Sequence, residues 1–177
     1  MPLDNDTGES LTAAAWLSNT AGEKEGLADI GQLVDFYDRY DFTGRFERTE
    51  HELQSVREIR PVIRRMLLSD RDEAPGVINE ILLSRHAIPQ LNKHGQRDWH
   101  IHAVGPQASF EDRILVEIAL AMSIAVIADE TSRISTCQAT QCENIVVDLT
   151  RNRSRRFCSV QCGNRMAVSA FRKRQTQ

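Results

Sequence analysis

Residues 137–162 read Cys137-Gln-Ala-Thr-Gln-Cys142-Glu-Asn-Ile-Val-Val-Asp-Leu-Thr-Arg-Asn-Arg-Ser-Arg-Arg-Phe-Cys158-Ser-Val-Gln-Cys162 and hold all four cysteines of the chain. The spacing is C-x4-C-x15-C-x3-C, and none of the five histidines lies in this segment. Two close cysteine pairs separated by about 15–20 residues are typical of a zinc ribbon, because each pair supplies two thiolates from one turn. We therefore predict one zinc ion per chain, bound by Cys137, Cys142, Cys158 and Cys162.

Two other readings of the cysteines are two disulfides or four unrelated buried thiols. The acidic N-terminus, MPLDNDTGES, lacks the apolar stretch of a signal peptide, and the most apolar run, 118–128, is too short to span a bilayer. We therefore expect a soluble cytoplasmic protein, in which disulfides are disfavoured, and unrelated thiols would not cluster. Four protein ligands leave no open position for water or substrate, so the site is predicted to be structural.

The residues around the ligands predict a hairpin and a helix. Residues 144–150 are rich in β-formers and should form the first strand of a hairpin, with the basic turn 151–156 after it. Ser159 can cap a helix that starts near Val160 and continues to Arg174. A small module of this kind has almost no core, so loss of one cysteine should unfold it and leave the rest of the chain folded.

Charge divides the chain at Asp148. Eight of the 22 Lys and Arg and none of the 25 Asp and Glu lie after it, so residues 1–148 carry a formal charge of −11 and residues 149–177 carry +8. An acid-free basic stretch indicates an anionic partner such as nucleic acid, or a disordered basic tail.

Nine residues of this basic stretch are candidates for nucleic-acid contact. The phosphate contacts should come from side chains that can share one surface beside the zinc: Arg151, Arg153, Arg155, Arg156, Arg172, Lys173 and Arg174. Asn164 and Arg165 follow the last ligand, where they either read bases or brace the zinc loop. We favour bracing for Asn164 and base contact for Arg165.

The same segment resembles the CGNR zinc-finger family, which is named for the tetrapeptide that stands here as Cys162-Gly163-Asn164-Arg165. Residues 148–159 are similar to that family's D-x-[ST]-[RK]-N-x-[ST]-[RK]-[RK]-[WF]-C-S segment, and residues 17–20 resemble an [LF]-x-N-T motif near the start of the family's N-terminal helical domain. The resemblance implies a bacterial stress-induced transcription regulator whose zinc module contacts DNA.

The N-terminal part reads as mostly helical. Helical apolar stripes occupy 30–40, 52–68 and 77–83, and Pro61 should kink or divide the second of these helices. Residues 99–104 alternate like a strand, and their candidate partner is 87–91. Ser109 opens the longest predicted helix, which runs to about Ser132 and should be the central helix of the core.

Several other residues have both a functional and a structural interpretation. His100 and His102 would leave a strand on one face, but no third metal ligand is identifiable, so we interpret them as exposed strand histidines. Asn19 and Thr20 either line a ligand pocket or cap the first helix. Trp16 and Trp99 are expected in the core. No P-loop, dinucleotide fingerprint or nucleophile elbow occurs, so we expect no enzyme.

These observations predict a mainly α protein with a small β element. Residues 1–132 should form an α-rich regulatory domain, and residues 133–177 a four-cysteine zinc-ribbon-like module that ends in a basic helix. The leading hypothesis is a DNA-binding transcription regulator whose N-terminal domain senses a small molecule or forms a homodimer. The alternative is an RNA-binding or protein-docking adaptor that uses the same zinc module.

Overall fold

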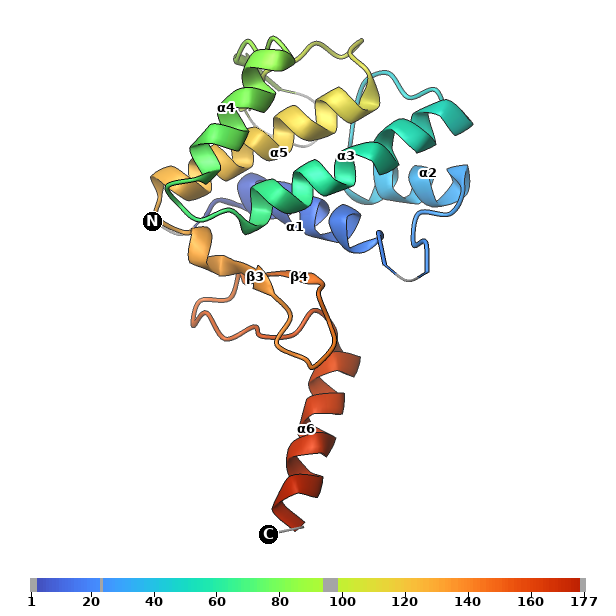
Figure 1. Ribbon diagram of the computed structural model, residues 1–177. Coiled ribbons are helices and arrows are strands. Elements are labelled where there is room, and N and C mark those ends of the chain that lie inside the picture. The colour runs from blue at the N-terminus through green and yellow to red at the C-terminus, as the bar shows by residue number, and fades with distance from the viewer. Residues whose placement is uncertain (1–2, 23, 94–98, 176–177) are drawn as a thin grey trace.

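The computed structural model describes residues 3–22, 24–93 and 99–175. Within these residues a mainly α body carries one small hairpin on its surface and a second at the base of a projecting helix (Figure 1). The elements are, in chain order, α1 (Asn5–Asn19), α2 (Ile30–Arg39), α3 (Glu50–Leu68), α4 (Ala74–Ser84), β1 (Gln90–Asn92), β2 (His100–His102), α5 (Phe110–Ile127), the 3-10 helix η1 (Thr131–Arg133), β3 (Ile134–Thr136), β4 (Ile145–Val147) and α6 (Val160–Gln175).

Helix α5 is the centre of the body, as its sequence predicts. It packs against α1, α3 and α4, and its apolar residues are buried on more than one side, including Ile114, Ile118 and Met122. The Ser109 hydroxyl accepts a hydrogen bond from the Asp112 N–H at 3.4 Å and so caps this helix.

Helix α3 runs without interruption through Pro61, so the division that this proline suggests does not occur. Its predicted stripe is buried, with Leu53, Val56 and Ile63 among the core residues, whereas Pro61 is exposed. The Arg57 carbonyl, which lacks a proline N–H partner, accepts from Arg60 Nε at 3.1 Å instead, which helps the helix to continue.

A cluster of aromatic rings closes the end of the body between α2 and α5. Phe36 lies at its centre, with its ring stacked on Trp16 at 5.2 Å and tilted against Phe110 at 6.3 Å. The prediction of a core position is confirmed for Trp16, but it is wrong for Trp99, which is 65% exposed on the β1–β2 hairpin.

Each hairpin pairs two short antiparallel strands. In the first, Gln90 faces His102 and Asn92 faces His100, close to the predicted pairing of 87–91 with 99–104. In the second, Ile134 faces Val147 and Thr136 faces Ile145. The expectation that 144–150 is the first strand of its hairpin is wrong, because its partner β3 precedes Cys137 and brings the apolar Ile134 into the core.

Helix α6 leaves the body at the β3–β4 hairpin and projects away from it (Figure 1). It begins at Val160, as predicted, and the Cys162 N–H donates to the Ser159 hydroxyl at 3.2 Å. Across the described part of the chain, every helix falls short of the length and apolarity that crossing a bilayer requires.

Candidate metal centre and the basic residues around it

The four cysteine sulfurs converge at the junction of the second hairpin and α6. Cys137 follows β3 directly, Cys142 lies in the turn before β4, Cys158 precedes α6, and Cys162 occupies its first turn. All four sulfurs lie within 4.8 Å of one another, and they form the only such group of three or more metal-ligating side chains among the described residues.

The spacing of the sulfurs fits a tetrahedral zinc ion. The Sγ atoms of Cys142, Cys158 and Cys162 are separated by 3.7, 3.6 and 3.8 Å. Zn–S bonds of about 2.3 Å place tetrahedral sulfurs about 3.8 Å apart, whereas a disulfide requires a separation of about 2 Å. All four cysteines are free thiols in the structure. The donor set therefore confirms the predicted site, which binds one structural zinc ion through four sulfurs.

Burial works against four free thiolates in this sulfur cluster. It raises the pKa of the Cys142 and Cys158 thiols above their ordinary range. Burial also acts to raise the pKa of Cys137, but the N–H groups of Cys158 and Ala139 outweigh it and lower that pKa. Four adjacent thiolates would repel one another in this partly desolvated site, and zinc removes that cost by binding all four as thiolates.

Side chains around the ligands orient the sulfurs. The Asn144 side-chain amide donates to Cys158 Sγ at 3.5 Å. The Arg165 guanidinium donates to Cys162 Sγ at 3.7 Å and to the Thr140 carbonyl at 3.2 Å. Gly163 lies against the Phe157 ring, which is 3.4 Å from where a Cβ would stand. Arg165 thus braces the zinc loop while its side chain remains exposed, and Asn164 is exposed as well. Base contact by either residue stays a prediction.

The basic loop 150–156 is held by the carboxylate of Asp148. One oxygen accepts from the Thr150 N–H at 2.8 Å and hydroxyl at 2.6 Å, and the other accepts from the Arg155 N–H at 2.8 Å. The Arg133 guanidinium donates to the Asp148 and Thr150 carbonyls at 2.9 and 3.0 Å. The carboxylate two residues before a threonine is an ordinary turn signal that could have identified this role from sequence. The loop is therefore ordered before any partner binds.

The predicted phosphate-binding residues differ in their surroundings. Arg153 is engaged by Glu130, whose Oε2 is 2.8 Å from its guanidinium, and by the Ser132 hydroxyl at 3.2 Å. Arg153 therefore helps to hold the loop, but its side chain is still 51% exposed, and its phosphate contact stays a prediction. Arg151, Arg155 and Arg156 are exposed on the loop.

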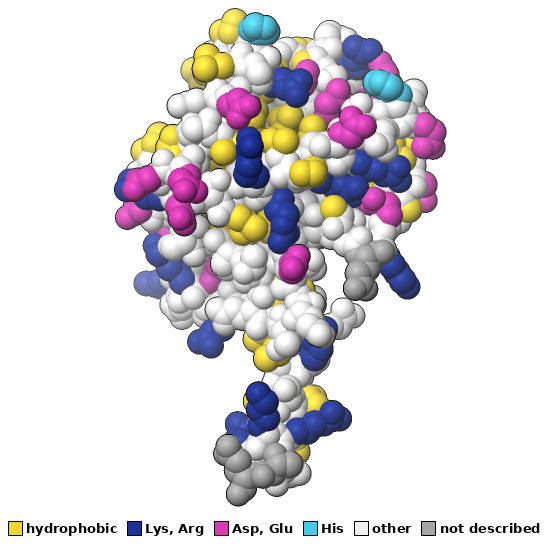
Figure 2. All heavy atoms as spheres, viewed as in Figure 1, with side chains coloured by type: hydrophobic (Ala, Val, Ile, Leu, Met, Phe, Trp, Pro, Cys, Tyr) yellow, Lys and Arg dark blue, Asp and Glu magenta, His cyan; other side chains and the backbone are white. Residues whose placement is uncertain are grey.

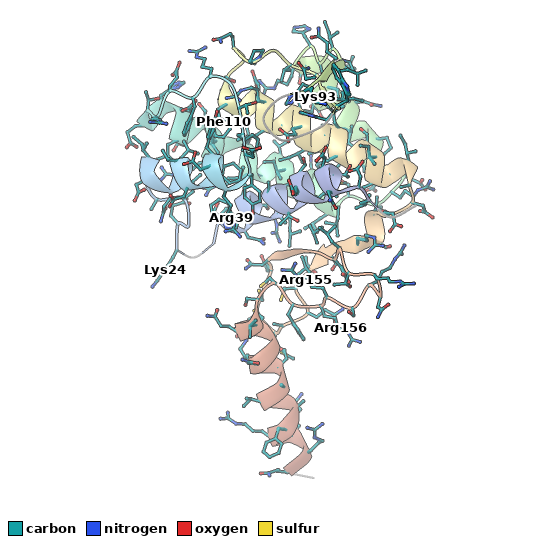
Figure 3. The ribbon with its side chains drawn as sticks, turned by 180° about the vertical axis from the view of Figure 1, so that it is seen from behind. Lys24, Arg39, Lys93, Phe110, Arg155 and Arg156 are labelled. Carbon is teal, nitrogen blue, oxygen red and sulfur yellow. The ribbon has the colours of Figure 1, made fainter. Side chains whose placement is uncertain are left out.

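The basic residues do not form the single surface beside the zinc that the sequence predicts. Arg172, Lys173 and Arg174 lie near the end of α6, about 15 Å along the helix axis from Cys162 at 1.5 Å per residue. Arg155 and Arg156 lie at the base of that helix, beside the hairpin (Figure 3). The structure therefore presents two basic regions, a loop region and a helix-end region.

Asn19 and Thr20 are taken up by contacts inside the protein. The Asn19 amide is bonded to the backbone of Ile145, with Nδ2 donating to its carbonyl at 2.9 Å and Oδ1 accepting from its N–H at 2.6 Å. The Thr20 hydroxyl donates to the Leu17 carbonyl at 2.6 Å and accepts from Arg60 at 3.1 Å. Both side chains thus hold the fold, and Thr20 occupies the C-cap of α1, which agrees with the capping interpretation.

His100 and His102 do lie on one face of β2, and their Nε2 atoms are 2.8 Å apart. Both are half-buried, which corrects the expectation of exposed side chains. Beside them a cavity of about 400 Å³ lies between the β1–β2 hairpin and α5, lined by residues that include Ile88, Ile101 and Val116. This cavity lies away from Asn19 and Thr20, so the motif near the end of α1 did not point to it.

Two family models match the chain. The CGNR zinc finger matches residues 133–175, and a family described as "Putative stress-induced transcription regulator" (ABATE) matches residues 11–130. The resemblance inferred from the cysteine segment is therefore confirmed. No curated protein sequence matches the chain.

Proposed function

We propose that the chain, which belongs to the family described as "Putative stress-induced transcription regulator" (ABATE) and carries a CGNR zinc finger, is a zinc-dependent regulator whose loop 150–156 binds duplex DNA. The observation that carries the proposal is the preformed loop. Asp148 holds three of its donors, and Arg151, Arg155 and Arg156 are exposed on it. Prearranged cations bind phosphates without the entropy cost of ordering a flexible tail.

The charge distribution favours DNA binding at the zinc module over binding at the helical body. No acidic residue follows Asp148, so DNA can approach the loop and α6 without meeting a carboxylate of that segment. Figure 2 shows Lys and Arg side chains along the projecting part of the molecule, whereas acidic side chains are scattered over the body. DNA bound at the zinc module would therefore lie away from most of the negative charge.

A salt-titrated affinity measurement on duplex DNA tests the proposal. For wild-type protein the logarithm of the association constant should fall with the logarithm of salt concentration, with a slope of roughly −0.9 per phosphate contact. Replacing Arg155 and Arg156 by Ala should weaken binding uniformly across sequences and make the slope shallower by roughly 0.9 per lost contact. The matched control is Arg65→Ala on α3, outside the zinc module, which should bind DNA like the wild type.

Two outcomes would redirect the proposal. If duplex RNA binds more tightly than DNA under the same salt conditions, the protein is an RNA-binding adaptor. If the affinity for neither nucleic acid changes on the double substitution while zinc content stays intact, the basic surfaces serve a protein partner.

Arg165→Ala should reduce zinc retention, because Arg165 contacts Cys162 and Thr140.

For the N-terminal domain we propose a sensing role at the cavity beside the β1–β2 hairpin. Its volume of about 400 Å³ is in the range of small-molecule sites, and its walls combine apolar side chains such as Ile88 and Ile101 with His102. A thermal-shift screen of small molecules tests this role, with Val116→Trp as the variant that fills the cavity. If no compound shifts the wild type and sedimentation shows a homodimer, the domain dimerises instead. We assign no catalytic step to either part and place the protein in the bacterial cytoplasm.

A further inference from the structure

Helix α1 contacts residues 145–149, which include strand β4, at two points, although the two segments are far apart in sequence. At the C-terminal end of α1, Asn19 is bonded to Ile145. Nearer its N-terminal end, Gly8 lies under Leu149, whose Cδ1 is 3.0 Å from where a Cβ of residue 8 would stand. Residues 145–149 therefore run antiparallel to α1, and the hairpin lies directly beneath the helical body (Figure 1).

The Asn19 amide bonds to the edge of β4 that faces away from β3. Cys137 N–H donates to the Asn144 carbonyl at 2.7 Å, and Asp148 N–H donates to the Arg133 carbonyl at 2.9 Å. Backbone groups alternate in direction along a strand, so the N–H and C=O of Ile145 point away from β3. The Asn19 amide satisfies both groups, as a neighbouring strand would.

Strand β4 also presents side chains to two different cores. Ile145 and Val147 belong to the main core of the helical body, together with Ile134 of β3. Val146 points the other way and packs with the zinc-ligating cysteines. The alternation of the strand therefore places one three-residue element in contact with both parts of the molecule.

Only Ile145 and Asn144 separate Asn19 from a cysteine sulfur. Asn144, next to Ile145, accepts a hydrogen bond from Cys137 N–H and donates one to Cys158 Sγ at 3.5 Å. On its other side, the Glu143 carbonyl accepts from Arg64 of α3 at 2.6 Å. The helical body thus holds the backbone on both sides of the residue that contacts two zinc ligands.

We propose that Asn19 couples zinc occupancy to the stability of the N-terminal domain. Zinc orders residues 142–144, these residues set the position of Ile145, and Ile145 anchors the end of α1. The coupling is reciprocal: the factor by which bound zinc favours the docked position of α1 is the factor by which docking of α1 raises zinc affinity. Asn19 is in this sense a positioning residue of the metal centre. The inference rests on the zinc site and is independent of DNA binding.

The test measures thermal unfolding of the full-length protein, with Trp16 fluorescence as the probe of the main core. Trp99→Phe serves as the background, because Trp99 is 65% exposed and would add its own signal. Removing zinc with a strong chelator should lower the unfolding midpoint by about 5 °C. The Asn19→Ala variant should lose at least about half of that shift and bind zinc roughly five- to tenfold more weakly in a competition assay.

Asn5→Ala is the matched control, because Asn5 is an exposed asparagine on the same helix. It should keep the full shift. The Asn19→Asp variant retains the acceptor for the Ile145 N–H and loses the donor to its carbonyl. It should give an intermediate shift in the unfolding midpoint. This variant keeps the test possible if Asn19→Ala does not fold. A purely structural Asn19 would lower the midpoint equally with and without zinc. That result, or a wild-type midpoint that is unchanged by the chelator, would overturn the proposal.

Discussion

At the scale of single residues, the polar side chains near the end of α1 form a network that joins buried Arg60 and Thr20 to the exposed Glu25. Arg60 donates to Glu25 Oε1 at 2.6 Å and Oε2 at 2.8 Å, and the same guanidinium reaches the Thr20 hydroxyl at 3.1 Å. The pair ties the segment after α1 to α3. Because two parallel bonds fix the fork against the carboxylate, this geometry is the strong form of an ion pair.

This ion pair predicts an acid-sensitive contribution to stability. The hydrogen bonds from Arg60 are the main reason that the pKa of Glu25 falls from 4.5 to about 2. A carboxylate with a lowered folded-state pKa stabilises the protein above its unfolded pKa, and this contribution disappears as the pH falls through the folded pKa. The wild type should therefore lose stability between pH 4.5 and 2 more steeply than Glu25→Gln.

Urea unfolding at a series of pH values measures this difference. Glu80→Gln is the control, because Glu80 pairs with Arg65 at the surface, where both side chains are more than half exposed. Such a pair adds little, and its loss should leave the pH dependence unchanged. Parallel pH curves for wild type and Glu25→Gln would show that the Arg60 contact does not contribute as described.

A second prediction at this scale concerns the metal ligands. Cys158→Ser should reduce bound zinc from about one equivalent per chain to near zero, because one of four thiolates is lost and Asn144 loses its sulfur acceptor. Elemental analysis of purified protein measures the zinc. Val160→Ser, two residues away and 79% exposed, should retain the metal. A Cys158→Ser variant that keeps a full equivalent of zinc would refute the four-cysteine site.

At the scale of elements, the connections between helices are held by side chains that reach backbone carbonyls. Arg113 of α5 donates to the carbonyls of Thr43 and Arg45, and the Arg45 N–H donates to the Pro106 carbonyl at 2.8 Å. Burial lowers the pKa of the Arg113 guanidinium, which remains charged because its usual pKa is so high. The loop before α3 is thereby fastened to the loop before α5.

Two glycines in different elements give opposite predictions for the same substitution. Gly44 has φ of +93°, and a Cβ there would stand 2.6 Å from the Pro106 carbonyl oxygen, so Gly44→Ala should destabilise the fold by about 1–3 kcal/mol. Gly76 lies in α4 with open space around it, so Gly76→Ala should stabilise by up to about 1 kcal/mol. Chemical denaturation of both variants measures the two free energies. A Gly44→Ala protein as stable as the wild type would contradict the close approach of the two loops.

At the scale of the whole molecule, the two family regions share one core. The side chains of Ile134, Ile145 and Val147 come from the zinc-finger region, yet they pack among the helices of the body. The boundary near residue 132 coincides with the ends of the two family regions, and the shared core predicts that these regions do not fold independently of each other. Loss of zinc is accordingly expected to affect the helical body, in contrast to the independence that the sequence suggests.

A fragment of residues 133–177 tests this shared core. It should bind zinc through its four cysteines, but the three side chains that pack on the helical body would be exposed to water, so the fragment should self-associate or remain partly disordered. Size-exclusion chromatography and amide NMR dispersion measure this. Replacing Ile134 and Val147 by Thr should improve its solubility. A monodisperse, well-dispersed native fragment would show that the zinc module folds alone.

The sequence by itself determined the local features of this protein. Cysteine spacing identified the four ligands, because the reach of a short turn limits which sulfurs can meet. Apolar periodicity located α2, α3 and α4, because burial of one face recurs with the helical repeat. Ser159 and Ser109 identified two helix starts, because a serine cap is a contact within four residues.

Only the tertiary structure decided which of the candidate polar residues face solvent and which hold the fold together. Asn19 and Ile145 are 126 residues apart, and no periodicity in either segment indicates that they meet. Arg153 and Arg151 have the same side chain, yet only the position of Glu130 makes Arg153 structural. The prediction that β4 pairs with a segment that follows it is likewise wrong, because the segments before and after β4 could both pair with it locally. The choice depended on where the apolar face of Ile134 could be buried, and that is a property of the assembled core.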